Sequence, residues 1–113
     1  MKSSPLKISI IGLGSMGSAL AKTLLKSESE IYLWNRTASK AKELNHKDSN
    51  ICLSPKKAIE SSELIIVCLL NYKVWSEIID SDLKNIDLRG KTIIQLTTGN
   101  VEEVLNHSEW VKK

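Results

Sequence analysis

The sequence lacks any long hydrophobic run. No stretch of its 113 residues approaches the roughly 20 consecutive apolar residues of a transmembrane helix. The opening segment MKSSPLK also has none of the apolar core that a signal peptide places near its start. We therefore expect a cytoplasmic protein that makes no contact with a membrane.

Cysteine, histidine and clustered charge are equally scarce. Cys52 and Cys68 lie in apolar runs without metal-ligand spacing, so we expect reduced, buried thiols and no metal site. His46 and His107 stand alone on polar segments, and no nucleophile–base pair accompanies them, so no catalytic residue is predicted. The formal charge of +3 is interspersed along the chain, and this pattern predicts no nucleic-acid partner.

Short apolar, β-prone segments recur along the chain, with helical patterns between them. The run Leu64–Leu70 has no polar alternation, so both of its faces must be buried, as in a central parallel strand. Parallel neighbours need crossover connections, which the intervening segments supply. The predicted strands are Lys7–Ile11, Ile31–Trp34, Asn50–Leu53, Leu64–Leu70 and Thr92–Leu96.

Helical spacing of apolar residues fills the intervals between these strands. The predicted helices run from Met16 to Leu25, from Thr37 as N-cap to about Leu44 or Asn45, from Pro55 to Ile59, through Val74, Ile78 and Ile79, and onward from Asn100 as N-cap. The alternation predicts one α/β domain over residues 1–113. Its fold class is a Rossmann-type doubly wound parallel sheet in the order 3-2-1-4-5, with helices on both faces.

Three glycines stand at the junction of the first strand and the first helix. Gly12, Gly14 and Gly17 spell G-x-G-x-x-G directly after the strand, which in this context is a dinucleotide-binding fingerprint. Gly12 would allow a tight turn, Gly14 would let the backbone approach a pyrophosphate, and Gly17 would let helix and strand pack closely. The helix would then direct its N–H groups and positive dipole end at the phosphates. The alternative is a glycine-rich turn without a ligand.

The end of the second strand indicates which dinucleotide binds. A site for NAD usually has Asp or Glu about 20 residues after the glycines, whereas this strand ends in the neutral Asn35, followed by Arg36 and Thr37. A carboxylate would repel a 2′-phosphate, while Arg36 offers a fork of donors that fits one, and Lys40 could add a second positive charge. The alternative is that Arg36 and Lys40 are ordinary surface residues that bind no ligand. The pattern favours NADP(H).

Four segments together, IGLGSMGSALAKTLL, WNRTASKA, VCLLN and LTTGNVEEV, resemble the β-hydroxyacid dehydrogenase superfamily, which shares the NADP-binding domain of 6-phosphogluconate dehydrogenase. The WNRT and LTTG segments look most like the imine reductase and reductive aminase branch. The resemblance extends from about Lys7 to Trp110 and implies an NADP-dependent oxidoreductase. The cofactor contacts that it implies are Gly12, Leu13, Gly14, Ser15, Met16 and Gly17, then Asn35, Arg36, Thr37 and Lys40, then Cys68, Leu69, Leu70 and Asn71, and finally Thr98.

Two further positions bear on this resemblance. Hydroxyacid members commonly have proline where this chain has Leu70, and the departure fits the imine reductase branch. Thr97 and Thr98 match the loop after the fifth strand, and by similarity Thr98 would lie near the nicotinamide ribose. The alternative is that both threonines only finish a strand and begin a turn.

Members of the superfamily continue into a large helical domain that supplies the substrate pocket and much of the dimer interface. None of the motifs of that domain occurs in this sequence. We therefore expect a cofactor domain that is catalytically incompetent alone, with a stand-alone NADP-binding module or a remnant that binds nothing as alternatives. Its expected partners are the cofactor and a C-terminal domain, a partner chain or a second copy. Trp110 lies off the apolar stripe of the last helix, so we expect self-association through the C-terminal side.

Overall fold

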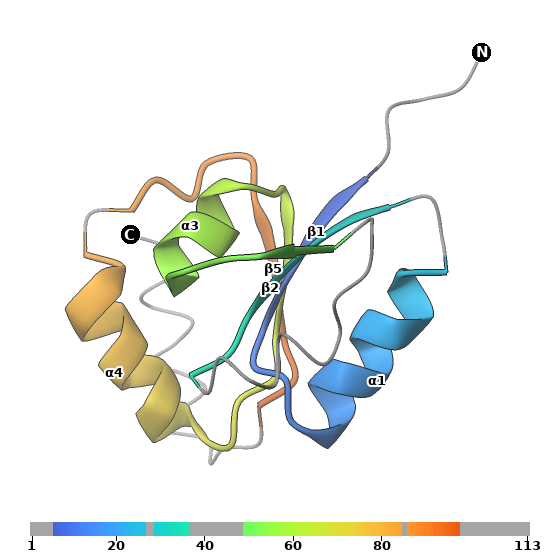
Figure 1. The fold of residues 1–113 in the computed structure, drawn as a ribbon. Coiled ribbons are helices and arrows are strands. Elements are labelled where there is room, and N and C mark those ends of the chain that lie inside the picture. Colours follow the sequence, from blue (N-terminus) through green and yellow to red (C-terminus); the bar gives the residue numbers. More distant parts are fainter. Residues whose placement is uncertain (1–5, 27–28, 37–48, 85, 98–113) are drawn as a thin grey trace.

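The computed structural model describes residues 6–26, 29–36, 49–84 and 86–97. Five parallel strands form one sheet in the order β3-β2-β1-β4-β5, which confirms the predicted Rossmann-type fold (Figure 1). The strands are β1 (Lys7–Ile11), β2 (Glu30–Trp34), β3 (Ser49–Ile51), β4 (Leu64–Val67) and β5 (Thr92–Gln95), and the helices are α1 (Ser15–Leu24), α3 (Pro55–Glu60) and α4 (Tyr72–Asp82).

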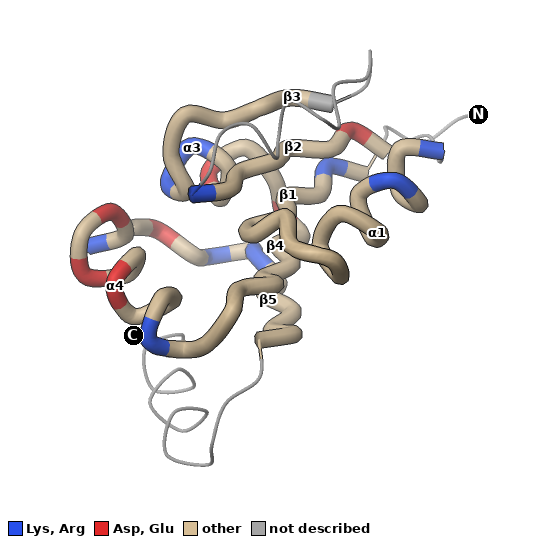
Figure 2. The backbone as a smooth tube through the Cα atoms, turned by 60° about the horizontal axis from the view of Figure 1, so that its bottom comes forward, with Lys and Arg blue, Asp and Glu red and all other residues tan. Residues whose placement is uncertain are grey.

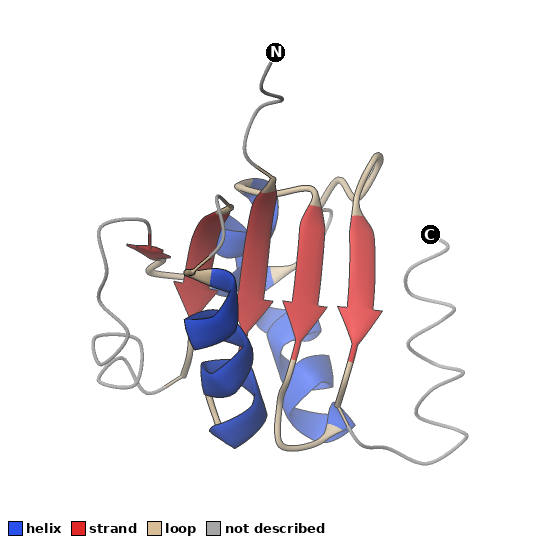
Figure 3. Ribbon diagram, turned by 90° about the vertical axis from the view of Figure 1, so that its right-hand side faces the viewer, coloured by secondary structure: helices blue, strands red, loops and turns tan. Residues whose placement is uncertain are grey.

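Helices cover both faces of the sheet, as expected (Figure 3). On one face, Leu20 and Leu24 of α1 pack against a buried cluster that includes Ile10 and Leu33. On the other face, α3 and α4 bury a second cluster that includes Trp75 together with strand residues of β1 and β4. The alternation of β1 side chains between the two clusters fixes its register, because a shift by one residue would exchange the two faces.

Three strands end earlier than their apolar runs predict, and β5 does so by one residue, at Gln95 rather than at Leu96. The strand β4 ends at Val67 rather than at Leu70, because the N–H of Leu69 donates to Thr97 Oγ1 (3.1 Å) and not to a neighbouring strand. Asn71 then caps α4, its Oδ1 accepting from the N–H of Val74 (3.0 Å). Leu70 therefore lies in a loop with 85% of its surface exposed, so the expectation of two buried faces holds only up to Val67.

The strand β3 likewise ends at Ile51 rather than at Leu53. Ser54 caps α3 by accepting from the N–H of Lys57 (3.1 Å), so the chain has already turned towards the helix and Leu53 is exposed. The early strand ends also correct the expectation for the cysteines. Cys52 and Cys68 are free thiols, but each follows directly after a strand and is half-buried rather than buried.

Several expectations lie outside the described residues: the helices beginning at Thr37 and Asn100, the two histidines, and Lys40, Thr98 and Trp110. Among the helices that the structure describes, none combines the length and the apolar character needed to cross a bilayer.

Candidate functional site

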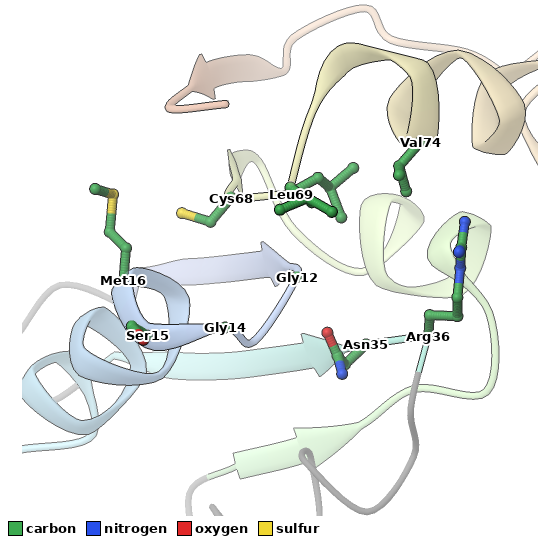
Figure 4. A pocket seen from close by; sticks show the side chains of 10 residues that line it. Gly12, Gly14, Ser15, Met16, Asn35, Arg36, Cys68, Leu69 and Val74 are labelled. Atoms are coloured by element: carbon green, nitrogen blue, oxygen red, sulfur yellow. The ribbon is translucent and has the colours of Figure 1, made fainter. Parts of the chain in front are cut away.

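The carboxyl ends of β1, β2 and β4 meet at the carboxyl-terminal end of the sheet, at the point where the strand order reverses. From β1 the chain proceeds to β2 and β3 on one side and then crosses to β4 on the other. Ligands of open parallel sheets bind at such a switch point. A pocket of about 430 Å³ opens there (Figure 4). It is lined by Gly12, Gly14, Ser15, Met16, Asn35, Arg36, Cys68, Leu69, Leu70 and Val74.

Two of the three glycines stand where backbone segments approach each other closely. Gly12 has a φ of +100°, and an added Cβ would collide with the carbonyl oxygen of Cys68. At Gly17 an added Cβ would collide with the carbonyl oxygen of Gly12. These positions require glycine because the strand, the loop and the first turn of α1 are packed backbone against backbone.

Gly14 is different, because an added Cβ would have no heavy atom within 4 Å. Its φ of −69° is one that any residue adopts, so neither strain nor packing explains a glycine here. The open space belongs to the pocket that Gly14 lines. The absence of a side chain therefore leaves room for a ligand beside the backbone.

The loop that carries Gly14 is fixed by hydrogen bonds on either side of it. The N–H of Gly12 donates to the carbonyl of Trp34 (2.8 Å), and the hydroxyl of Ser18 donates to the carbonyl of Leu13 (2.7 Å). The side chain of Leu13 is 1% exposed and anchors the loop in the core. The pocket wall is thus preorganised.

The amino end of α1 faces this pocket through Ser15 and Met16 (Figure 4). No side chain caps this end of the helix, and its first turn contains no acidic residue. The first N–H groups of a helix and its positive dipole end attract anions. Together with the open space at Gly14, the helix end offers a place for a phosphate group.

Asn35 follows the last residue of β2 and reaches back to the glycine loop. Its Oδ1 accepts a hydrogen bond from the N–H of Leu13 (2.8 Å). A neutral amide therefore occupies the position at which a carboxylate would repel a 2′-phosphate.

Arg36 extends from the end of β2 towards α4 (Figure 4). Its guanidinium pairs with Glu77 of that helix, with 3.4 Å between Nη2 and Oε2. The two side chains are 64% and 56% exposed, so the pair remains in contact with water.

The opposite wall of the pocket is apolar. Leu69 and Leu70 come from the loop after β4, and Val74 comes from the first turns of α4. Cys68 lies beside them, and burial raises the pKa of its thiol. The thiol is therefore neutral near pH 7, and none of these four residues adds a negative charge to the pocket.

The structure thus brings together most of the predicted contacts that fall on described residues. Leu13, Gly17 and Asn71 support the pocket without lining it, through the core, the first turn of α1 and the cap of α4. Thr37, Lys40 and Thr98 lie outside the described residues.

Sequence reasoning missed Val74 and Glu77. In the sequence, Val74 is only one of the apolar residues that predict its helix, and nothing in the local pattern distinguishes Glu77 from other surface acids. Within the described ranges, no group of three His, Cys, Asp or Glu residues could hold a metal ion.

The family model for the NAD binding domain of 6-phosphogluconate dehydrogenase matches residues 7–113. The chain belongs to this family. The glycine loop, the helix end and the pocket all lie within the residues that this family model matches.

Within the family, three similar proteins are reductive aminases or imine reductases, as the expected branch requires. An NADPH-dependent reductive aminase of Aspergillus oryzae is 34% identical over 104 residues, which are 92% of this chain and 35% of that protein. An imine reductase structure from Pseudomonas sp. superposes with a TM-score of 0.91 at 32% identity and covers 96% of this chain and 38% of the other. A reductive aminase from Aspergillus terreus, in complex with NADPH and ethyl levulinate, has a TM-score of 0.84 at 32% identity and the same two coverages. The chain thus spans little more than a third of the length of these relatives.

Proposed function

We propose that the chain binds NADP(H) and serves as the cofactor domain of an oxidoreductase of the imine reductase type. The observation that carries the proposal is the open space beside Gly14, at the uncapped amino end of α1. This is where a pyrophosphate could lie against backbone N–H groups.

The residues around the pocket divide into three groups by their chemistry. The backbone of Gly14, Ser15 and Met16 would hold the pyrophosphate. Arg36, beside the neutral Asn35, would bind a 2′-phosphate, with Thr37 and Lys40 following in the sequence. Leu69, Leu70 and Val74 would provide the apolar surface for the rest of the nucleotide, and by family similarity Cys68, Asn71 and Thr98 belong to the cofactor loops.

A bound nicotinamide supplies hydride chemistry, while the surrounding protein positions the substrate. The reductive aminase and imine reductase relatives support an imine substrate for the whole enzyme, with a hydroxyacid as the alternative. The substrate pocket would come from a C-terminal domain or a partner chain. On its own, the chain should bind cofactor without turnover.

We also propose that the C-terminal side of the domain associates with a second copy or a further domain. In the described sheet, β5 is an edge strand; Ile94 within it and Leu96 directly after it are 39% and 41% exposed. Exposed strand edges with apolar side chains favour pairing.

The cofactor proposal is tested by titration calorimetry of the chain with NADPH and with NADH. A charge-assisted bidentate contact contributes about 1.5–3 kcal/mol, so NADPH should bind about tenfold more tightly or better. Arg36→Ala should remove most of this preference and leave NADH binding nearly unchanged. The matched control is Arg89→Ala. Arg89 is also an exposed arginine, but it precedes the amino end of β5, whereas the pocket lies at the carboxyl ends of the strands. Equal dissociation constants for the two cofactors would contradict the preference, and binding of neither would contradict the proposed function.

A further inference from the structure

Arg36 and Glu77 connect two elements that lie on different sides of the pocket. Arg36 follows β2 and lines the pocket, whereas Glu77 belongs to α4. Val74 also lines the pocket and precedes Glu77 by three residues, so both project from the same side of the helix. Glu77 therefore stands at the rim of the pocket and holds the guanidinium at 3.4 Å.

We propose that Glu77 is a specificity-determining residue of the cofactor site, because it competes with the 2′-phosphate for Arg36. This inference rests on the proposed function. The Nη2 group that contacts Glu77 belongs to the guanidinium that would bind a phosphate, and an N–H that donates to the carboxylate cannot donate to the phosphate with full geometry at the same time. Binding of NADPH therefore requires that Arg36 leave Glu77, whereas binding of NADH requires no such exchange.

The exposure of the Arg36–Glu77 pair determines how strongly Glu77 competes with a phosphate for Arg36. Both side chains are more than half exposed, so water screens the pair and its contribution to stability is small. Loss of the carboxylate should consequently leave the fold intact. Its effect should appear in phosphate binding, where Arg36 would no longer have a competing partner.

Helix α4 offers a matched control for the charge itself. It carries Asp80 and Asp82 further from the pocket, and Figure 2 shows the acidic residues along this helix. Asp80→Asn removes the same unit of charge as Glu77→Gln, but one turn further along α4. A general electrostatic effect would appear in both variants, whereas competition for Arg36 would appear only in Glu77→Gln.

The experiment measures dissociation constants of the chain for two pairs of ligands that differ by a 2′-phosphate. The pairs are NADPH with NADH, and adenosine 2′,5′-bisphosphate with 5′-AMP. An exposed ion pair is worth up to about 1 kcal/mol, so Glu77→Gln should tighten binding of the two 2′-phosphorylated ligands by about twofold to fivefold, with changes below about twofold for the other two. Asp80→Asn should change all four by less than about twofold.

A second comparison, of Arg36→Ala with the double variant Arg36→Ala/Glu77→Gln, tests whether Glu77 acts through Arg36. The two variants should bind the 2′-phosphorylated ligands with the same dissociation constants. The inference is overturned if Glu77→Gln leaves their affinity unchanged or weakens it, if the gain persists without Arg36, or if Asp80→Asn gives an equal gain. Those results leave the proposed function standing as long as the unaltered chain prefers NADPH. If the unaltered chain binds none of the four ligands, the proposed function and this inference are both wrong.

Discussion

Asn35 Oδ1 accepts a hydrogen bond from the backbone N–H of Leu13, with 2.8 Å between the two atoms. The bond joins the end of β2 to the glycine loop after β1, so the residue that replaces an acid also holds the loop in place. A neutral amide does this without adding a negative charge beside Arg36. One side chain therefore contributes both to the shape of the glycine loop and to the charge of the site.

Asn35→Asp should separate these two roles. A carboxylate can still accept from Leu13, so the free energy of unfolding should change by no more than about 0.5 kcal/mol. Because like charges at contact distance cost about 1 kcal/mol per pair of unit charges even in water, NADPH should bind about tenfold more weakly or worse, while NADH binds as well or better. Calorimetric titration and chemical denaturation measure the two effects. Unchanged NADPH affinity would place the 2′-phosphate away from Asn35.

Gly14→Val should abolish cofactor binding and leave the fold intact. The added side chain enters open space and the backbone of Gly14 has a negative φ, so only the loss of glycine at the N-cap of α1 should lower the free energy of unfolding, by about 1 kcal/mol. The branched side chain would occupy the place beside the backbone where the pyrophosphate should lie. Thermal unfolding and NADPH fluorescence titration measure stability and binding. A folded variant with normal affinity would show that the pocket beside Gly14 does not receive the phosphates.

Gly17→Ala, unlike Gly14→Val, should lower the stability of the fold through a steric clash. Its added Cβ would collide with the carbonyl oxygen of Gly12, a backbone atom of the loop between β1 and α1. Overpacking of this kind costs about 1–3 kcal/mol of stability. Gly14→Ala is the matched control, because it adds the same methyl group three residues earlier into open space. Equal stability of the two variants in urea denaturation would contradict the close packing at Gly17.

These glycines also indicate how far sequence reasoning extends. The tight turn at Gly12 and the close packing at Gly17 were predictable because spacing along one strand–loop–helix unit determines them locally. The strand order followed from the alternation of apolar runs and helical patterns. The end of β4 could not be predicted in this way. The hydrogen bond from Leu69 N–H to Thr97 Oγ1, with which the strand ends, joins residues 28 positions apart.

The pair of Arg36 and Glu77 was beyond sequence reasoning for the same physical reason. Its members are 41 positions apart, and their meeting depends on how α4 is rotated over the sheet. That rotation is set by the burial of Trp75 and Ile78 and by the cap at Asn71, which together turn Val74 and Glu77 towards the pocket. A surface glutamate carries no local signal of such a position.

The last prediction concerns the proposed association through the C-terminal side. Leu96 lies beside the edge strand β5 and is 41% exposed, and lysine there would place a charge on the surface that a second copy should cover. Sedimentation velocity should show a dimer at high micromolar concentration for the unaltered chain. Leu96→Lys and Trp110→Lys should shift it to monomer.

Leu53→Lys is the matched control for this experiment. Leu53 is 96% exposed and follows β3 at the opposite edge of the sheet, so lysine there should leave the dimer unchanged. A clean monomer for the unaltered chain, or equal loss of the dimer in all three lysine variants, would contradict the proposed surface. Even a confirmed dimer should reduce no imine, because pairing at β5 covers an edge but adds no substrate pocket opposite the residues that would hold the cofactor.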